Sequence, residues 1–440
     1  MLASFMSVTK ASAESQRRFD EYIGVLASAM GHADRLAPLH HYCSGLILPG
    51  ERKSVEPMAA ITAPSRVGAQ HKSLLHFVGN SPWDDADVLA AVRGYALPPL
   101  LQKSRDVAWL VDDTGMVKKG KHSVGVARQY CGQVGKQENC QVAVSLTIAN
   151  EFASLPIAYR LYLGESWAKD PERRKKAKVP DDIAFLTKPE IALLQIEDAV
   201  DAGLPKGPVL ADAGYGHDMK FRTRVTELSL TYCVGIQSTT TLWPPGLSPL
   251  PPAPRGKNGR PPTRLRRTAG NEPVTAKELA QSLHPGGFRI VRWRDGTKGK
   301  MKSRFAAVRV RPANRDDRRT KPHPEEWLVI EWSDGEPEPT KYWLSTLPAK
   351  TSLKELVRTA KLRWRIERDY EELKDELGLH HYEGRGWRGF HHHATLCIAA
   401  YAFLIRERLF SPSGETAPQL ELPVPEVPAR YRPRGAASPH

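Results

Sequence analysis

The sequence predicts an α/β protein in which helices flank a mixed sheet, with a helical N-terminal domain and a β-rich insertion before the last helices. Apolar residues recur with a helical period before Lys103. Short continuous apolar runs, typical of buried strands, follow between 107 and 236, and alternating apolar and basic residues follow from 288. The 440 residues suffice for two or three domains with a sizeable core.

The first predicted domain, residues 1–102, is helical. Tyr22, Val25, Leu26 and Ala29 have the spacing of one helix face. Acidic residues from Asp84 onward occupy the first turn of another predicted helix, which we expect to reach about Gly94, as the helix dipole favours.

Two apolar strands that end in aspartate are predicted in residues 103–242. Val107–Val111 runs into Asp112 and Asp113, and 208–211 runs into Asp212. A helix is expected from about Pro189 to Ala202. Three further strands are predicted in this region at 141–146, 155–161 and 231–236, and the first two should form an antiparallel meander with the strand that ends at Asp113.

A basic β-rich insertion is predicted for residues 243–348. It begins with a connection rich in proline and glycine, 244–262, which cannot continue a sheet. Arginine then alternates with apolar residues on both sides of Asp295 and Gly296, which predicts a hairpin with one basic face. The predicted strands are 288–294, 304–311, 326–332 and 340–345.

Residues 349–410 return to helices. Ser352 and Glu355 form a capping-box pattern at the start of a helix that should run to about Leu377, before Gly378. A second apolar helix is expected over 394–404. The proline-rich residues 411–440 are predicted to be a disordered tail.

The positive charge is concentrated in one stretch of the chain. The formal net charge is +15, and residues 255–319 contain 19 Lys and Arg against five Asp and Glu, which contributes +14. A solvated charged face normally mixes both signs, so this clustering favours a polyanionic partner, nucleic acid.

No run of about 18 apolar residues and no export signal is visible, so we expect a soluble, cytoplasmic protein without a membrane partner. Five scattered cysteines without a CxxC pair predict reduced core thiols, and neither a disulfide framework nor a zinc module.

Three carboxylates are candidates for one site. Asp113 and Asp212 follow apolar strands, where α/β sheets place functional residues, although for each residue alone the cap of a turn is the favoured explanation. Glu367 lies on the long predicted helix with Arg363 and Lys374 at offsets that put all three on one face. A surface ion pair between Arg363 and Glu367 is the simpler explanation of that pair alone.

Together these motifs resemble a bacterial insertion-sequence transposase of the DDE superfamily, over about Asp20 to Arg408. Arg363-x3-Glu367-x6-Lys374 matches the end of the Tyr-Arg-Glu-Lys signature, with Ala360 in place of the tyrosine. Asp113 precedes Thr114 as the first acid of the family does, and Asp112 is the less favoured choice. Asp212 lies in an apolar-Asp-x-Gly-Tyr context.

The resemblance implies a ribonuclease H-like core that the insertion interrupts, and metal-dependent DNA cleavage at element ends followed by strand transfer. Asp113, Asp212 and Glu367 would be catalytic and would bind two Mg²⁺ (or Mn²⁺) ions, which prefer oxygen ligands. Double-stranded transposon ends and target DNA, a homodimer, nucleoid association and end binding by residues 1–102 are implied as well. The expected DNA-binding residues are Arg363, Lys374, Lys118, Lys119, Arg289, Arg292 and Arg294.

Other functions remain open from the sequence. A ribonuclease H-like nuclease without strand transfer would have the same metal chemistry, and a catalytically silent, transposase-derived DNA-binding protein would have the same surface. A glycoside hydrolase with two carboxylates is a more distant alternative.

Two other motifs have structural explanations. His391–His393 cannot all face one ion on a helix, so we expect a helix start near DNA or in the core. Tryptophans of the insertion could stack on bases, but packed aromatic residues are more common.

Overall fold

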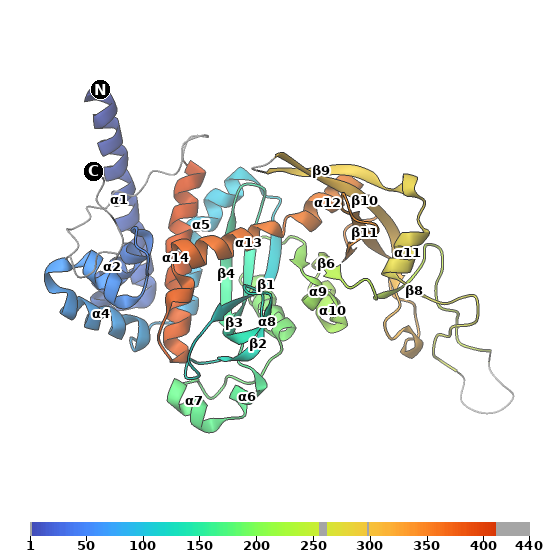
Figure 1. Ribbon diagram of the computed structural model, residues 1–440, viewed down its shortest axis with the longest axis horizontal. Coiled ribbons are helices and arrows are strands. Elements are labelled where there is room, and N and C mark those ends of the chain that lie inside the picture. Colours follow the sequence, from blue (N-terminus) through green and yellow to red (C-terminus); the bar gives the residue numbers. More distant parts are fainter. Residues whose placement is uncertain (1, 255–261, 297–298, 411–440) are drawn as a thin grey trace. The chain divides into compact units, whose positions relative to one another are not determined.

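The computed structural model describes residues 2–254, 262–296 and 299–410, with side chains from residue 13 onward (Figure 1). These residues form two compact units. Unit 1 contains residues 2–106, 113–195 and 365–410, and unit 2 contains 107–112 and 196–364 with the gaps noted. The predicted disordered tail lies outside the described residues, as does part of the connection rich in proline and glycine, 255–261.

Helices make up the first part of unit 1 and pack on its last helix. Their bounds are α1 (Leu2–Met30), η1 (Ala33–Arg35), α2 (Leu36–Ile47), α3 (Val55–Thr62), η2 (Pro64–Arg66), α4 (Val67–Gly79) and α5 (Asp85–Lys103). The last helix of the unit, α14 (Trp387–Phe410), packs against α2, α4 and α5. Asp84 caps α5 by accepting from the Ala86 amide at 2.7 Å, as the acidic first turn predicted. The helix extends past Gly94 because Leu97 and Leu100 are buried.

The strands of unit 1 are antiparallel. They are β2 (Ala127–Cys131), β3 (Lys136–Ala149) and β4 (Ser154–Leu161), and β3 pairs with both of the others. The antiparallel pairing of β3 with β4 confirms that part of the predicted meander. Strand β2 was not predicted, because its side chains alternate between half-buried and exposed positions without an apolar run. Two short helices follow, α6 (Glu165–Ala168) and α7 (Pro171–Ala177).

Two elements pass from one unit into the other along the chain. Strand β1 (Ala108–Val117) changes unit between Asp112 and Asp113, and α8 (Lys188–Asp201) does so between Gln195 and Ile196. Each unit therefore contains one of the two neighbouring aspartates of β1.

Unit 2 contains a mixed sheet with parallel strands at one side. The first residues of β1, which belong to this unit, pair in parallel with β5 (Val209–Ala211). Strand β5 pairs in parallel with β6 (Tyr232–Ile236). Antiparallel pairing continues through β12 (Lys341–Ser345), β11 (Glu326–Trp332), β10 (Gly299–Pro312) and β9 (Arg289–Gly296), while β7 (Thr241–Trp243) and β8 (Val274–Thr275) extend from β10. The parallel β1–β5 pair confirms that the two predicted strands are adjacent. The prediction that the first of them ends in aspartate is wrong, because β1 continues through Asp112 and Asp113 to Val117.

The helices of unit 2 before its C-terminal segment are short. They are α9 (Ala213–Gly216), α10 (Met219–Glu227), α11 (Ala276–Ser282), η3 (Pro285–Gly287) and η4 (Asp316–Arg318). Both α9 and α10 pack against β6.

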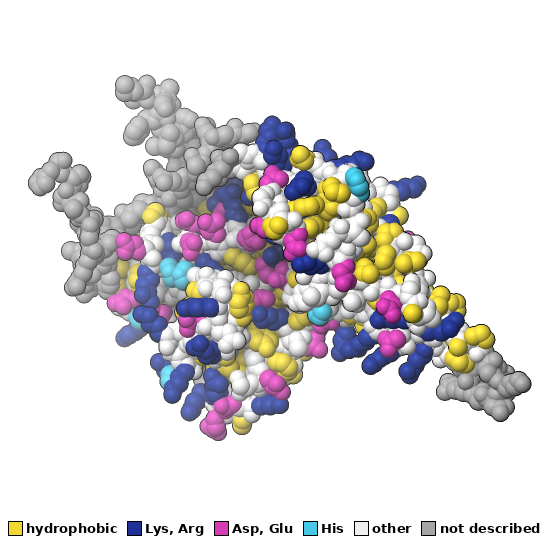
Figure 2. Space-filling model, turned by 45° about the vertical axis from the view of Figure 1, so that its right-hand side comes forward, with side chains coloured by type: hydrophobic (Ala, Val, Ile, Leu, Met, Phe, Trp, Pro, Cys, Tyr) yellow, Lys and Arg dark blue, Asp and Glu magenta, His cyan; other side chains and the backbone are white. Residues whose placement is uncertain are grey.

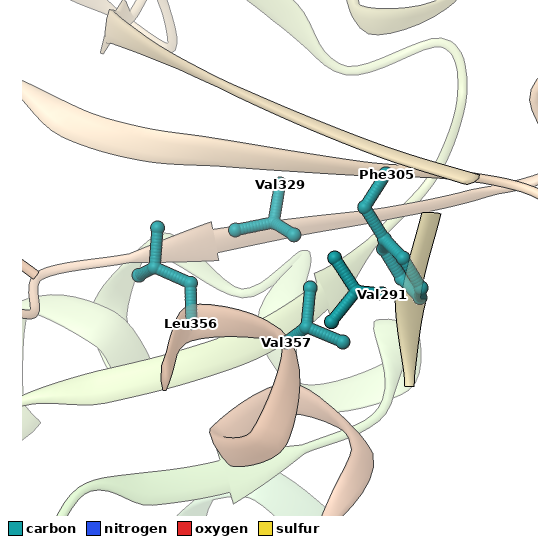
Figure 3. Packing of buried hydrophobic residues seen from close by; sticks show 5 residues of the cluster. All are labelled: Val291, Phe305, Val329, Leu356 and Val357. Atoms are coloured by element: carbon teal, nitrogen blue, oxygen red, sulfur yellow. The ribbon is translucent and has the colours of Figure 1, made fainter. Parts of the chain in front are cut away.

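The predicted β-hairpin forms and packs on a helix. Asp295 and Gly296 do not form the turn as predicted, because they belong to β9 and pair with Lys300 and Gly299 of β10. Strand β9 lies beside β10 at the outer side of the sheet. Figure 3 shows that side chains of this hairpin and of β11 point toward those of α12 (Leu353–Lys361). The buried cluster consists of Val291, Phe305, Val329, Leu356 and Val357. Apolar burial thus fixes α12 on the sheet.

The prediction of one continuous helix from Ser352 to Leu377 is wrong. Ser352 does cap α12, its hydroxyl accepting from the Glu355 amide at 3.2 Å, but α12 ends at Lys361. The chain continues as α13 (Trp364–Glu371), the π-helical turn η5 (Glu372–Glu376) and η6 (Leu379–His381). The break and the π turn change the helical phase, so Arg363, Glu367 and Lys374 do not follow one uninterrupted helix face as predicted.

The five cysteines are buried free thiols, as predicted. Within the described part of the chain, no helix is both long enough and apolar enough to cross a membrane.

Candidate active site

The two neighbouring aspartates of β1 have different cationic partners. In unit 1, Lys188 Nζ lies 2.8 Å from Asp113 Oδ2. In unit 2, Arg363 Nη1 lies 2.7 Å from Asp112 Oδ2. Successive side chains of a strand point to opposite faces, so the two carboxylates lie on opposite sides of β1, each beside its own cation.

The strand register of unit 2 relates Asp112 to Asp212. Trp109 pairs with Val209 and Leu110 with Leu210. Continuing this register by two residues places Asp112 level with Asp212, on the same face of the sheet. Asp112 was the less favoured first acid in the sequence, and this geometry makes it a direct competitor of Asp113.

Asp212 is held in a tight turn at the end of β5. Its Oδ1 accepts from the backbone amides of Gly214 at 2.9 Å and Tyr215 at 3.4 Å, so it caps the short helix α9. The turn packs closely on β6, because a Cβ at Gly216 would lie 1.9 Å from the Gly235 carbonyl oxygen. One carboxylate oxygen thus fixes the residue, and Oδ2 has no hydrogen-bond donor among the described residues.

Gly216→Ala should displace this turn. The added methyl group cannot share space with a backbone carbonyl, so we expect a loss of about 1–3 kcal/mol in stability together with reduced activity. Gly287→Ala is the matched control in unit 2, since a Cβ there meets nothing within 4 Å. Urea unfolding of both variants tests this; equal midpoints would contradict the close packing of the Asp212 turn.

Glu367 is exposed on α13 in unit 1, and the opposite side of this helix is buried. Asp369, which is 1% exposed, accepts from the Ser154 hydroxyl at 2.5 Å and the Tyr401 hydroxyl at 2.8 Å. The Tyr370 hydroxyl lies 2.7 Å from that of Ser145. Buried polar contacts to β3, β4 and α14 therefore set the position of the helix that carries Glu367.

Burial raises the pKa of Asp369 to about 7, with the two hydroxyl donors opposing the shift. The folded chain then keeps a proton that the unfolded chain releases near pH 4. The stability that this carboxyl contributes is full below about pH 4 and is lost as the pH rises to about 7.

Asp369→Asn removes the titration and should remove this pH dependence. We expect the stability of the wild type relative to the variant to decrease by up to about 1.4 kcal/mol per pH unit between pH 4 and 7. Urea unfolding at several pH values measures the difference. A constant difference over this range would show that Asp369 does not change protonation on folding.

Two lysines that the sequence assigned to DNA make internal contacts. Lys374 is 8% exposed and donates to the Gly115 carbonyl at 3.0 Å. Lys118 donates to the Tyr382 carbonyl at 2.7 Å, and burial lowers its pKa to about 8. Lys119 is exposed. The sequence gives no signal for these carbonyl contacts, and phosphate contacts of the three lysines stay predictions.

The predicted single basic face of the insertion hairpin is wrong, because Arg289 pairs with Phe305 on the side of the buried cluster, whereas Arg292 pairs with Lys302 on the other side. Arg289 and Arg292 are exposed, whereas the Arg294 guanidinium lies 4.0 Å from the ring centre of Trp364. Figure 2 shows Lys and Arg side chains interspersed with acidic ones on the visible face.

The tryptophans of the insertion make internal contacts. Trp293 and Trp343 pack on the buried cluster, and the indole N–H groups of Trp327 and Trp332 donate to backbone carbonyls. Arg304 stacks on the Trp332 ring and Arg309 on the Trp327 ring. These contacts fit the expectation that the tryptophans are packed side chains rather than residues that stack on bases.

The three consecutive histidines are buried in unit 1, in agreement with the expected core position. His391 and His393 each make contacts that suit a neutral ring, the latter with the Tyr42 hydroxyl and the Gly378 carbonyl. Burial lowers the pKa of His392 to about 3. Through such contacts the three histidines hold α14 against α2, α4 and β4.

Sequence reasoning missed Lys188 and Asp369. Lys188 follows Thr187 at the start of a predicted helix and has no motif that links it to Asp113. Asp369 had a usable signal, because it lies three residues after Ile366 and four before Leu373, both buried on the apolar side of this segment. A carboxylate at such a spacing predicts a buried polar anchor.

The three predicted acids belong to different units, with Asp113 and Glu367 in unit 1 and Asp212 in unit 2. In the residues that the structure describes, no three His, Cys, Asp or Glu side chains are grouped so that they could hold a metal ion. Their convergence stays a prediction.

The model of the DDE superfamily endonuclease family matches residues 25–300, and the chain belongs to this family. Over 199 residues it is 33% identical to the probable transposase for insertion sequence element IS701 of Microchaete diplosiphon. The match covers 44% of this chain and 47% of that protein, so the chain spans about half the length of this relative.

Proposed function

We propose that this protein is an insertion-sequence DNA transposase that cleaves DNA at the ends of its element and joins those ends to target DNA. The observation that carries the proposal is the parallel pairing of β1, which contains Asp113, with β5, which ends just before Asp212, in a member of a DDE endonuclease family. Similarity to a protein named as a transposase supports the choice of transposition over other nuclease reactions.

Asp113, Asp212 and Glu367 are the residues that we propose to hold two Mg²⁺ or Mn²⁺ ions. Carboxylate oxygens are the ligands that hard divalent cations prefer. Asp113 already holds a cationic group, the Lys188 ammonium, on Oδ2, which fits a metal ligand. The ions would supply activation of the attacking oxygen and stabilisation of the leaving oxygen. Asp112, level with Asp212, is the competing first ligand.

The residues of the chain itself would position DNA. The exposed Arg289 and Arg292 suit contacts with phosphates. Arg363, which pairs with Asp112 of β1, would lie beside a phosphate of the substrate. Residues 1–102 would bind element ends, and bringing two ends together favours a homodimer.

The domain arrangement is part of the proposal. Residues 103–242 and 349–410 would form a ribonuclease H-like core, and 243–348 the insertion within it. The mixed sheet with parallel β1, β5 and β6 in unit 2 supports such a core.

Inverted repeats in the DNA that brackets the gene would identify the substrate. We expect purified protein with Mg²⁺ to cut linear DNA at those repeats and to join the ends to a supercoiled plasmid. Cutting without joined products would favour a nuclease, and binding without cutting would favour a silent DNA-binding protein.

A further inference from the structure

Lys188 is placed on Asp113 by a well-anchored helix. Its ammonium lies 2.8 Å from Asp113 Oδ2, and the two side chains are 28% and 25% exposed. The Glu190 carboxylate accepts from the amide and hydroxyl of Thr187, both at 2.8 Å, which fixes the start of α8. Further along α8, Ile191 is buried and Gln195 donates to the Val144 carbonyl at 3.0 Å.

The pair has a chemical consequence for Asp113. An ammonium at this distance uses the lone pairs of Oδ2, the same electrons that a divalent cation needs. A second positive charge within a few ångströms also opposes binding of a cation electrostatically. Lys188 and a metal ion therefore compete for one carboxylate oxygen.

We propose that Lys188 is a counter-ion of Asp113 in the metal-free protein and that metal binding displaces it. This inference rests on the proposed function, because it takes Asp113 as a metal ligand. Lys188 acts as a positioning residue: it holds the carboxylate in place and balances its negative charge until the ion binds. It therefore helps to set the metal concentration at which the site fills.

Direct titration of the full chain with Mn²⁺ alone tests the proposal, with free Mn²⁺ counted by electron paramagnetic resonance. Lys188→Met keeps the length of the side chain and removes the charge. We expect it to bind Mn²⁺ about fivefold more tightly, the effect of losing one partly exposed ion pair. Lys188→Arg keeps the charge and should bind as the wild type does. Lys175→Met, an exposed lysine of unit 1, is the control and should leave binding unchanged.

Asp113→Asn separates failure of this inference from failure of the proposed function. If Asp113→Asn weakens Mn²⁺ binding but Lys188→Met binds as the wild type or more weakly, the competition is refuted and the metal site stands. If Asp113→Asn and Lys188→Met both bind as the wild type, Asp113 is not a ligand, and both proposals fail in their present form.

Lysine footprinting gives a second readout that a purely structural role would not change. An ammonium held by Asp113 is protected from acylation, so the labelling rate of Lys188 should rise several-fold when Mn²⁺ is added. The rate at Lys175 should stay constant. A Lys188 rate that is unchanged or falls with Mn²⁺ would overturn the displacement.

Discussion

Asp113→Asn, Asp212→Asn and Glu367→Gln should each abolish Mg²⁺-dependent cleavage and joining of DNA and leave DNA binding intact. Each change keeps the size of the side chain but removes an anionic oxygen that the cation requires. Loss of a direct ligand should cost more than the roughly 10- to 100-fold typical of groups that only support a ligand. A cleavage assay on the DNA that brackets the gene, beside a binding assay, measures both.

Asp112→Asn is the matched comparison for the first acid. If Asp113 is the ligand, Asp112→Asn should retain cleavage, although loss of the Arg363 pair should lower the rate. An inactive Asp112→Asn beside an active Asp113→Asn would move the ligand to the residue that is level with Asp212. Normal cutting by all four variants would refute a metal nuclease.

Neutralising the exposed arginines of the hairpin should weaken DNA binding for all sequences. Each phosphate contact contributes about 0.9 to the slope of log affinity against log salt concentration, so Arg289→Gln with Arg292→Gln should lower that slope by about 1.8. Arg294→Gln should have a smaller effect because its guanidinium already stacks on Trp364.

Lys220→Gln provides a control for this experiment, because Lys220 is exposed on α10 and carries the same charge. Fluorescence anisotropy over a range of salt concentrations measures each slope. An unchanged slope in the double variant would exclude the hairpin as a phosphate-contacting surface.

The local pattern of the chain was sufficient to predict much of the fold. Continuous apolar runs predicted β1, β5 and β6, and their buried side chains explain why, since both faces of these strands are covered. Alternation predicted β9 and β10, where one side of the hairpin packs on α12. Strand β2, with one buried residue, had no such signal.

What the sequence could not show depends on tertiary contacts. The break after α12 occurs in a segment whose helical periodicity continues, and Lys361 at its end is held by Glu331, 2.5 Å away on β11. Lys374 reaches a backbone carbonyl, which no side-chain motif records. The choice between Asp112 and Asp113 depends on strand register, and one residue of shift reverses the face.

Iron-directed cleavage of the protein backbone tests most directly whether the three acids form one metal site. Fe²⁺ in place of Mg²⁺, with ascorbate and peroxide, produces radicals that cut the chain close to the bound ion. We predict cuts near Asp113, Asp212 and Glu367 together, suppressed by excess Mg²⁺ and absent from Asp212→Asn. Cuts that leave out any of these three positions, or that persist in excess Mg²⁺, would contradict the shared site.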